Sequence, residues 1–404
     1  MLAKHLVFVS ELGANFGHIT PQHTLAGLVS SQLPNTRISF VLPKLATASV
    51  LEQGSYNYQL FQAPVATFAK TRANTVPASF AENLLLRGYT QTERLALAVK
   101  VWRDLLRTLD PGVVVFDYAP TAQIAAHGLG FKKNMLGNGF AILPQSSVIP
   151  GYFVAQASDS RLREADAQVL QAANSALEKL ALPKFESTQQ MFDCDEKFLI
   201  SVREMDCYAK WRQDSEYFGF LSASSGQRRA RWPSSSGKPR AFVYLNTTFP
   251  FLTELLLLLS EVCVSQVFIG GARAEDFQSL SGPNLIISPE PFDTRATLPE
   301  CDLVVCHGGF GTVGHALGYG KPILILPLQT EQQMTAQQLH RHNLALCVGP
   351  SPRWPMLREQ IVSGFAELGR LQENAQHYQS RYRESFAYDT CDQRIASILT
   401  EQLS

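Results

Sequence analysis

The chain alternates short, continuously apolar runs with longer segments in which apolar residues recur every three or four positions. In the first half, His5–Ser10, Arg37–Leu42 and Val113–Asp117 are apolar runs of strand length. The segment TERLALAVKVWRDLLRTLD has a helical period and is closed by Pro111-Gly112. Strands that alternate with helices predict parallel βαβ units and an open, doubly wound α/β sheet.

The same pattern restarts in the second half, after one break in composition. Residues 222–239, SASSGQRRARWPSSSGKP, are rich in Ser, Gly, Arg and Pro, which predicts an interdomain linker or an exposed loop. The runs AFVYLN, VSQVFIGG, NLIIS, CDLVVC and PILILP then predict the strands of a second sheet, with a Leu-rich helix after the first of them. Two such sheets predict a ligand at the carboxyl ends of their strands.

The bulk composition excludes several classes of protein. Lys+Arg and Asp+Glu number 35 each, so nothing favours nucleic acid or an anionic membrane as a partner. The seven cysteines lack any CxxC spacing, which argues against a disulfide framework or a zinc site. The N-terminus does not resemble a signal peptide, and charged residues interrupt FPFLTELLLLLSEVCV, the most apolar stretch. We expect a cytoplasmic protein without a membrane span.

A glycine-rich loop after the predicted strand CDLVVC carries the clearest chemical signal. Residues 307–312, HGGFGT, lead from Cys306 into the helical segment VGHALGYG. Glycines at a helix start let the backbone approach a phosphate, whose charge the free N–H groups and the helix dipole favour. Thr312 adds a hydroxyl donor, and the imidazole of His307 adds a further N–H donor. The sequence therefore predicts a diphosphate site at His307, Gly308, Gly309, Gly311 and Thr312.

A second loop follows the next predicted strand, PILILP. Glu331 and Gln332 stand four and five residues after Pro327, at the start of another helix. A carboxylate beside an amide accepts and donates hydrogen bonds, which suits a ligand rich in hydroxyl groups. Glu and Gln are also ordinary helix-capping residues. Next to a phosphate loop, the pair predicts a site for a sugar attached to a diphosphate.

Together, HGGFGT, ALGYGKPILILP and the Glu-Gln pair resemble the donor signature of the family 1 glycosyltransferases, the UDP-glycosyltransferase group with the GT-B fold. The N-terminal loop GANFGHITPQHTLAGL is similar to the GHxxP segment of that family, as it occurs in bacterial members. The resemblance implies two Rossmann-like domains facing across a cleft. Residues 1–221 would bind the acceptor, 222–239 would be the linker, 240–380 would bind the nucleotide sugar, and the helix 381–404 would return to the first domain.

The resemblance also implies roles for individual residues. His18 would be the general base of an inverting transfer, with Asp117 as its orienting partner, because a neutral imidazole backed by a carboxylate can take the proton of an acceptor hydroxyl. The loop 307–312 would hold the diphosphate without a metal, and no cofactor is expected. Further contacts to the nucleotide or its loops would come from Phe292, Thr247, Thr248 and Gly17.

The acceptor and the alternatives stay open at this point. Segments 63–89 and 139–153 are apolar and aromatic, which favours a small lipophilic or aromatic acceptor, although core packing explains the aromatics equally well. They contain Phe68, Phe80, Tyr89, Phe140, Tyr152 and Phe153. UDP and dTDP sugars are the favoured donors, and a monomer or a homodimer is expected. A sugar-nucleotide epimerase and a non-catalytic partner protein are the competing hypotheses.

Overall fold

The computed structural model describes residues 4–13, 16–64, 76–152, 157–212, 217–222, 226–233, 237–349 and 353–404. The chain divides into two compact units. The first unit comprises residues 1–219 and 389–404, and the second comprises residues 220–388. Each is built on its own parallel sheet of six strands, as the apolar runs predict.

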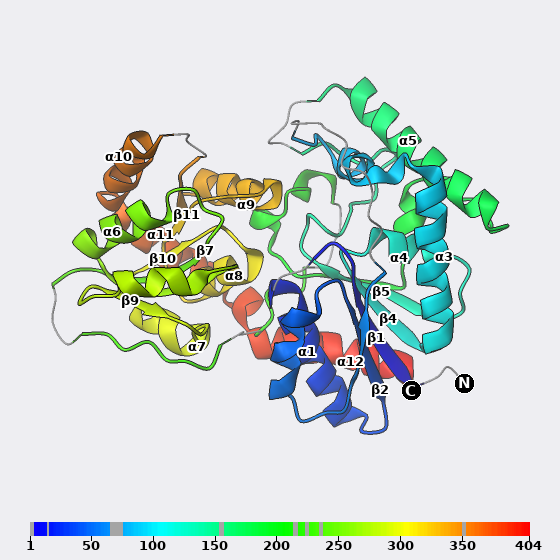
Figure 1. The fold of residues 1–404 in the computed structure, drawn as a ribbon, viewed down its shortest axis with the longest axis horizontal. Helices are drawn as coiled ribbons and strands as arrows, with labels where there is room; N and C mark the ends of the chain where they lie inside the picture. Colours follow the sequence, from blue (N-terminus) through cyan, green and yellow to red (C-terminus); the bar gives the residue numbers. More distant parts are fainter. Residues whose placement is uncertain are drawn as a thin grey trace. The chain divides into compact units, whose positions relative to one another are not determined.

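The first unit has the strand order β3-β2-β1-β4-β5-β6 (Figure 1). The central strands β1 and β4 are buried along their whole length, which is why their sequences are continuously apolar. They pair in parallel, with Ser10 opposite Asp117, so both end at the same edge of the sheet. The strands are β1 (His5–Ser10), β2 (Arg37–Leu42), β3 (Gln59–Gln62), β4 (Val113–Asp117), β5 (Lys132–Gly137) and β6 (Glu196–Leu199).

Helices cover the first sheet on both sides. α3 packs against α4 and α5. The C-terminal helix α12 is joined to α1 by two hydrogen bonds: the Gln32 amide donates to Gln393, and the Thr400 hydroxyl donates to Gln32 (Figure 1). Residues 389–404, nearly all of α12, thus belong to the first unit. The helices are α1 (Phe16–Gln32), α2 (Phe80–Leu84), α3 (Thr92–Leu109), α4 (Pro120–Ala125), α5 (Asp159–Lys179) and α12 (Tyr388–Leu403).

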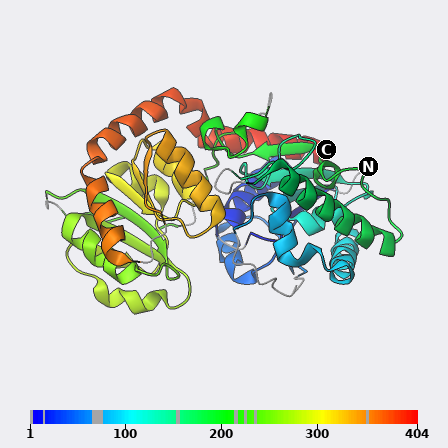
Figure 2. The same cartoon turned by 90° about the horizontal axis from the view of Figure 1, so that it is seen from above.

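The second unit has the strand order β12-β11-β10-β7-β8-β9. The Leu-rich helix α6 and the later helix α10 share a core with β7, in which Val243, Leu255 and Ile361 are fully buried. The strands are β7 (Arg240–Asn246), β8 (Val264–Gly270), β9 (Leu285–Ser288), β10 (Leu303–Cys306), β11 (Ile323–Ile325) and β12 (Ala345–Cys347). The helices are α6 (Leu252–Val262), α7 (Thr294–Thr297), α8 (Phe310–Gly318), α9 (Thr330–Arg341), α10 (Trp354–Phe365) and α11 (Leu368–Arg381), the last two orange in Figure 2.

The segment 222–239 differs from the linker that its composition predicts. The units divide at residue 219, so the whole segment lies within the second unit. Its described part pairs with that unit, because Arg228 forms a parallel bridge with Phe292 and the Gln266 side-chain amide donates to the carbonyl of Arg231 (2.6 Å). The composition conceals this pairing, since the segment contributes backbone atoms to it and its described arginines are exposed.

No helix in the described part of the chain is long and apolar enough to cross a bilayer.

Candidate functional site

In the first unit, the structure brings His18 and Asp117 together. Asp117 is the last residue of β4, and His18 lies in the first turn of α1, which follows the neighbouring strand β1. The Nδ1 atom of His18 lies 3.0 and 2.9 Å from the two carboxylate oxygens of Asp117. A carboxylate only accepts, so the ring proton sits on Nδ1 and the basic lone pair on Nε2. The Asp117 side chain is 7% exposed and that of His18 is 31% exposed, so solvent reaches the ring but hardly the acid.

Gln22, which is not among the residues predicted from the sequence, completes this group. It lies on α1 one turn after His18, and its side-chain amide donates to Asp117 Oδ2 (3.0 Å) and to Ser10 Oγ (2.8 Å). The spacing of four residues is a signal that could have placed it on the same helix face as His18.

The backbone around the pair is also specialised. Gly13 is buried against the His18 ring, and a Cβ atom added there would overlap that ring. Tyr118, directly after Asp117, has a left-handed backbone with φ of 47°, and its carbonyl accepts from the Leu12 amide (3.1 Å). Such conformations are costly for a bulky residue and concentrate at functional sites. Gly17 is exposed, and in the described part of the chain an added Cβ would meet no atom within 4 Å beyond its own helix backbone and chain neighbours.

A second carboxyl group lies at the end of β1. Glu11 accepts from the first amides of α4, those of Thr121 (2.8 Å) and Ala122 (3.3 Å). Burial raises the pKa of the Glu11 carboxyl to about 7.

Four of the aromatic residues expected to line an acceptor pocket are buried, and Phe140 packs against both Phe80 and Tyr152. Phe80, Tyr89, Phe140 and Tyr152 are at most 9% exposed. Tyr118 is half-buried, and its ring packs against Phe80 and Phe140 with centroids 5.9 and 5.7 Å apart. Core packing therefore explains these four aromatics, and the half-buried Tyr118 directly follows Asp117 in the chain. Phe68 and Phe153 lie outside the described residues.

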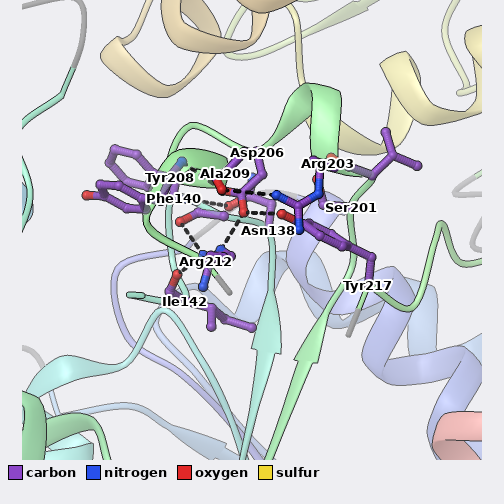
Figure 3. Close-up of polar contacts among 12 residues, drawn as sticks. Asn138, Phe140, Ile142, Ser201, Arg203, Asp206, Tyr208, Ala209, Arg212 and Tyr217 are labelled. Atoms are coloured by element: carbon purple, nitrogen blue, oxygen red, sulfur yellow. Dashed lines mark hydrogen bonds and ion pairs between the residues drawn. The ribbon is translucent and has the colours of Figure 1, made fainter. Parts of the chain in front are cut away.

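A buried ion pair fixes the turn that carries Phe140 (Figure 3). Arg212 binds Asp206 and donates to the carbonyl of Ile142 (2.5 Å), while Tyr217 donates its hydroxyl to Asp206 (2.9 Å). Both charged side chains are at most 4% exposed. Breaking a buried pair is strongly destabilising, so this network holds the turn after β5 in one position.

In the second unit, the loop 307–312 forms the predicted strand–helix turn. Gly309 caps α8, and an added Cβ at Gly309 or Gly311 would meet no atom of the described residues within 4 Å, local backbone and chain neighbours aside. Gly308 has φ of 88°, and an added Cβ would lie 2.8 Å from Ile325 and 3.3 Å from the Gln332 carbonyl. The first amides of α8 have no partner within the helix, as at any helix start. The turn thus exposes backbone donors that can bind an anion.

The imidazole of His307 does not serve as the phosphate donor that the sequence suggested. Its Nδ1 donates to the Leu326 carbonyl (2.7 Å), and its Nε2 accepts from the Asn246 amide (2.9 Å). Burial lowers the pKa of the ring, which keeps it neutral. Both ring nitrogens therefore have hydrogen-bond partners. His307, which directly follows β10, links the last residue of β7 to the residue after β11.

The remaining expected donor residues divide into two groups. Gln332 lies against Gly308, but its side-chain oxygen caps α9 by accepting from the Leu328 amide (2.8 Å), and Glu331 beside it is half-buried. Thr247 and Thr248 follow β7, where the Thr248 hydroxyl donates to the Asn246 side chain (2.8 Å).

Phe292 does not offer a stacking surface for a nucleotide base. Its ring is 2% exposed and packs edge-on against Phe242. Solitary aromatics after a strand are easily misread in this way, because a sequence does not show whether the ring points into the core.

Across the described residues, no group of three or more His, Cys, Asp or Glu side chains could hold a metal ion.

Comparison with known proteins agrees with this architecture. Residues 265–389 match the family described as glycosyltransferase family 28 C-terminal domain. No curated protein matches the chain. CalG4, the calicheamicin glycosyltransferase, is similar at 18% identity with a TM-score of 0.69, over 100% of this chain and 99% of that one.

Two further structures of glycosyltransferases are similar over 98% of this chain and 99% of theirs. VinC in complex with DTDP has 16% identity and a TM-score of 0.65, and SnogD from Streptomyces nogalater has 16% identity and a TM-score of 0.62. These similarities establish the GT-B fold, with two Rossmann-like domains. Most of the second unit, residues 265–389, therefore matches a glycosyltransferase domain, within a chain that has the GT-B fold.

Proposed function

We propose that the protein transfers a sugar, with inversion, from a UDP or dTDP sugar to a hydroxyl group of a small lipophilic or aromatic acceptor. The observation that carries the proposal is the paired His18 and Asp117 at the carboxyl ends of adjacent strands. The glycine-lined start of α8 supports it, and so do VinC and SpnG, whose structures contain thymidine diphosphate. The half-buried ring of Tyr118, next to Asp117, favours an aromatic or lipophilic acceptor.

The transfer proceeds in one displacement. The acceptor oxygen forms a bond to the anomeric carbon while its proton passes to Nε2 of His18. The bond between the anomeric carbon and the diphosphate oxygen breaks at the same time, and the nucleoside diphosphate leaves. Asp117 holds the ring and stabilises the imidazolium, as the acid does in a serine-protease triad.

Backbone donors are proposed to take the place of a metal at the leaving group. Negative charge grows on the departing diphosphate, and the first amides of α8 are preorganised to receive it. Gly309 and Gly311 let the phosphates approach, and Thr312 adds its hydroxyl. Calorimetry with UDP and dTDP in excess EDTA tests this assignment, because binding that disappears with the chelator contradicts it.

His18→Ala is expected to lose transfer by about 10²–10⁴-fold, the usual contribution of a positioned base. Asp117→Asn is expected to reduce the rate of transfer by a smaller factor, because the imidazole remains. Single-turnover transfer is measured after a thermal-shift screen of nucleotide sugars has identified the donor. Donor affinity, determined in parallel, is expected to stay at the wild-type value in both variants. Near-wild-type turnover in His18→Ala would overturn the assignment of the base.

A further inference from the structure

Gln22 is the one fully buried amide side chain in contact with Asp117 among the described residues; its exposed fraction is 0%. Both hydrogens of its amide are used, one on Asp117 Oδ2 at 3.0 Å and one on Ser10 Oγ at 2.8 Å. Asp117 Oδ2 also accepts from His18 Nδ1 at 2.9 Å. The amide of Gln22 and the ring of His18 therefore bind the same carboxylate oxygen.

The side-chain oxygen of Gln22 lacks a hydrogen-bond partner among the described residues. This atom, Oε1, is buried. A buried polar atom without a partner destabilises a fold, whereas an apolar side chain of the same size would not. Packing alone therefore does not account for a glutamine at this position.

The orientation of the amide follows from its surroundings. With the amide turned over, Oε1 would face the carboxylate oxygen of Asp117, and two acceptors would repel each other. The observed orientation gives Asp117 two donors on Oδ2, which fixes the plane of the carboxylate. That plane in turn fixes the direction of the His18 Nδ1–H bond and hence of Nε2.

We propose that Gln22 is a positioning residue for the general base: it holds the Asp117 carboxylate in the orientation that aims His18 at the acceptor. This inference rests on the proposed function. A hydrogen bond to a carboxylate also spreads its negative charge. Without the Gln22 donor, Asp117 stabilises the imidazolium of His18 more strongly, so a higher pH is needed to obtain the neutral base.

Other titratable groups lie on the elements around this cluster. They are Glu11 after β1, bound to the start of α4, His23 on α1, bonded to Tyr56 (2.8 Å), and Tyr118 after β4. A substitution of Gln22 leaves these groups in place, so a change in the pH profile reports on the His18–Asp117 pair.

The test is Gln22→Met, an apolar side chain of similar length. We expect kcat to fall by about tenfold, the lower end of the losses found for hydrogen-bond partners of a functional side chain. The acid limb of the pH–rate profile is expected to move to higher pH. Affinity for the nucleoside diphosphate is expected to stay unchanged. Tm is expected to stay close to that of the wild type, because removal of the orphaned Oε1 offsets the loss of the hydrogen bond to the buried Ser10 hydroxyl.

Ser10→Ala is the matched control. It removes the other partner of the Gln22 amide and leaves the bond to Asp117. We therefore expect kcat to stay within twofold of the wild-type value and the acid limb of the pH–rate profile to be unmoved within error. A Gln22→Met enzyme with wild-type kcat and an unmoved acid limb overturns the proposal. So does a loss of kcat that is matched by a loss of Tm, because it indicates a purely structural role.

Parallel measurements on His18→Ala separate the two hypotheses. If His18→Ala retains turnover, the assignment of the base has failed. If His18→Ala is inactive and Gln22→Met is fully active with an unchanged profile, only the role of Gln22 has failed.

Discussion

A glycine determines where the imidazole of His18 can lie. Gly13 precedes α1, and its α-carbon faces the ring so closely that no Cβ atom fits between them. This requirement is invisible in the sequence, where Gly13 is one of several glycines in a loop. It arises because the ring must lie flat against the backbone in order to reach Asp117.

Gly13→Ala is therefore expected to displace His18 and to lower kcat by about 10²-fold, the scale on which a misplacement of about 1 Å reduces catalysis. Donor affinity is expected to be unchanged. Turnover and calorimetric donor binding are the measurements. Gly27→Ala, within α1, is the control, because its Cβ would make an ordinary contact of 3.7 Å with Tyr56. Equal activities of the two variants would show that the ring does not depend on Gly13.

At the scale of elements, the positions of His18 and Asp117 could be predicted because the strands before them are buried and apolar. Parallel strands end at one edge of a sheet, so residues that follow β1 and β4 must meet. Strand β3 could not be read in this way, because Gln59–Gln62 is polar and largely exposed at the edge of the sheet. The role of His307 was misread for a related reason. Its partners, Asn246 and Leu326, come from other strands, and only the register of the sheet brings them to the ring.

Replacing His307 is expected to destabilise the fold, which replacing a side chain that only binds phosphate would not do. His307→Ala leaves the Asn246 amide and the Leu326 carbonyl without their partner, and each such group costs about 1–3 kcal/mol when buried. We expect the free energy of unfolding of the second unit to fall by about 2–4 kcal/mol, with a weaker diphosphate affinity as a consequence of the loosened loop. Urea unfolding of the variant checks this. A His307→Ala variant with wild-type stability and weakened diphosphate binding would instead support a direct contact between His307 and phosphate.

For the whole molecule, the chain crosses between its two units near residues 219 and 388, and both crossings contact α8. The Phe220 ring stacks on Phe310, the first residue of α8, and rests against Gly314. Tyr388 donates its hydroxyl to the Gly314 carbonyl (3.3 Å). The helix proposed to bind the diphosphate is thus also the helix on which the chain enters and leaves the second unit.

Buried and half-buried histidines in both units give the whole molecule a predicted dependence on pH. Burial lowers the pKa below the ordinary value of 6.5 for five of them. They are His5, His23, His127, His307 and His315. Such a ring gains its proton more readily in the unfolded chain, so the stability it contributes is present above pH 6.5 and is lost as the pH falls below that value. Glu11 acts in the opposite direction, because its raised pKa of about 7 makes the folded protein the better proton acceptor between pH 7 and 4.5.

The five histidines outweigh the single glutamate, so unfolding is expected to take up protons as the pH falls from 8 to 5.5. Each proton taken up adds a slope of about 1.4 kcal/mol per pH unit to the stability. The urea midpoint, measured at constant ionic strength, should be flat above pH 7.5 and fall steeply below pH 6.5. Glu11→Gln removes the opposing group and should steepen that fall. A midpoint that rises on acidification to pH 6 would mean that the histidines gain stabilising partners when protonated, contrary to their burial.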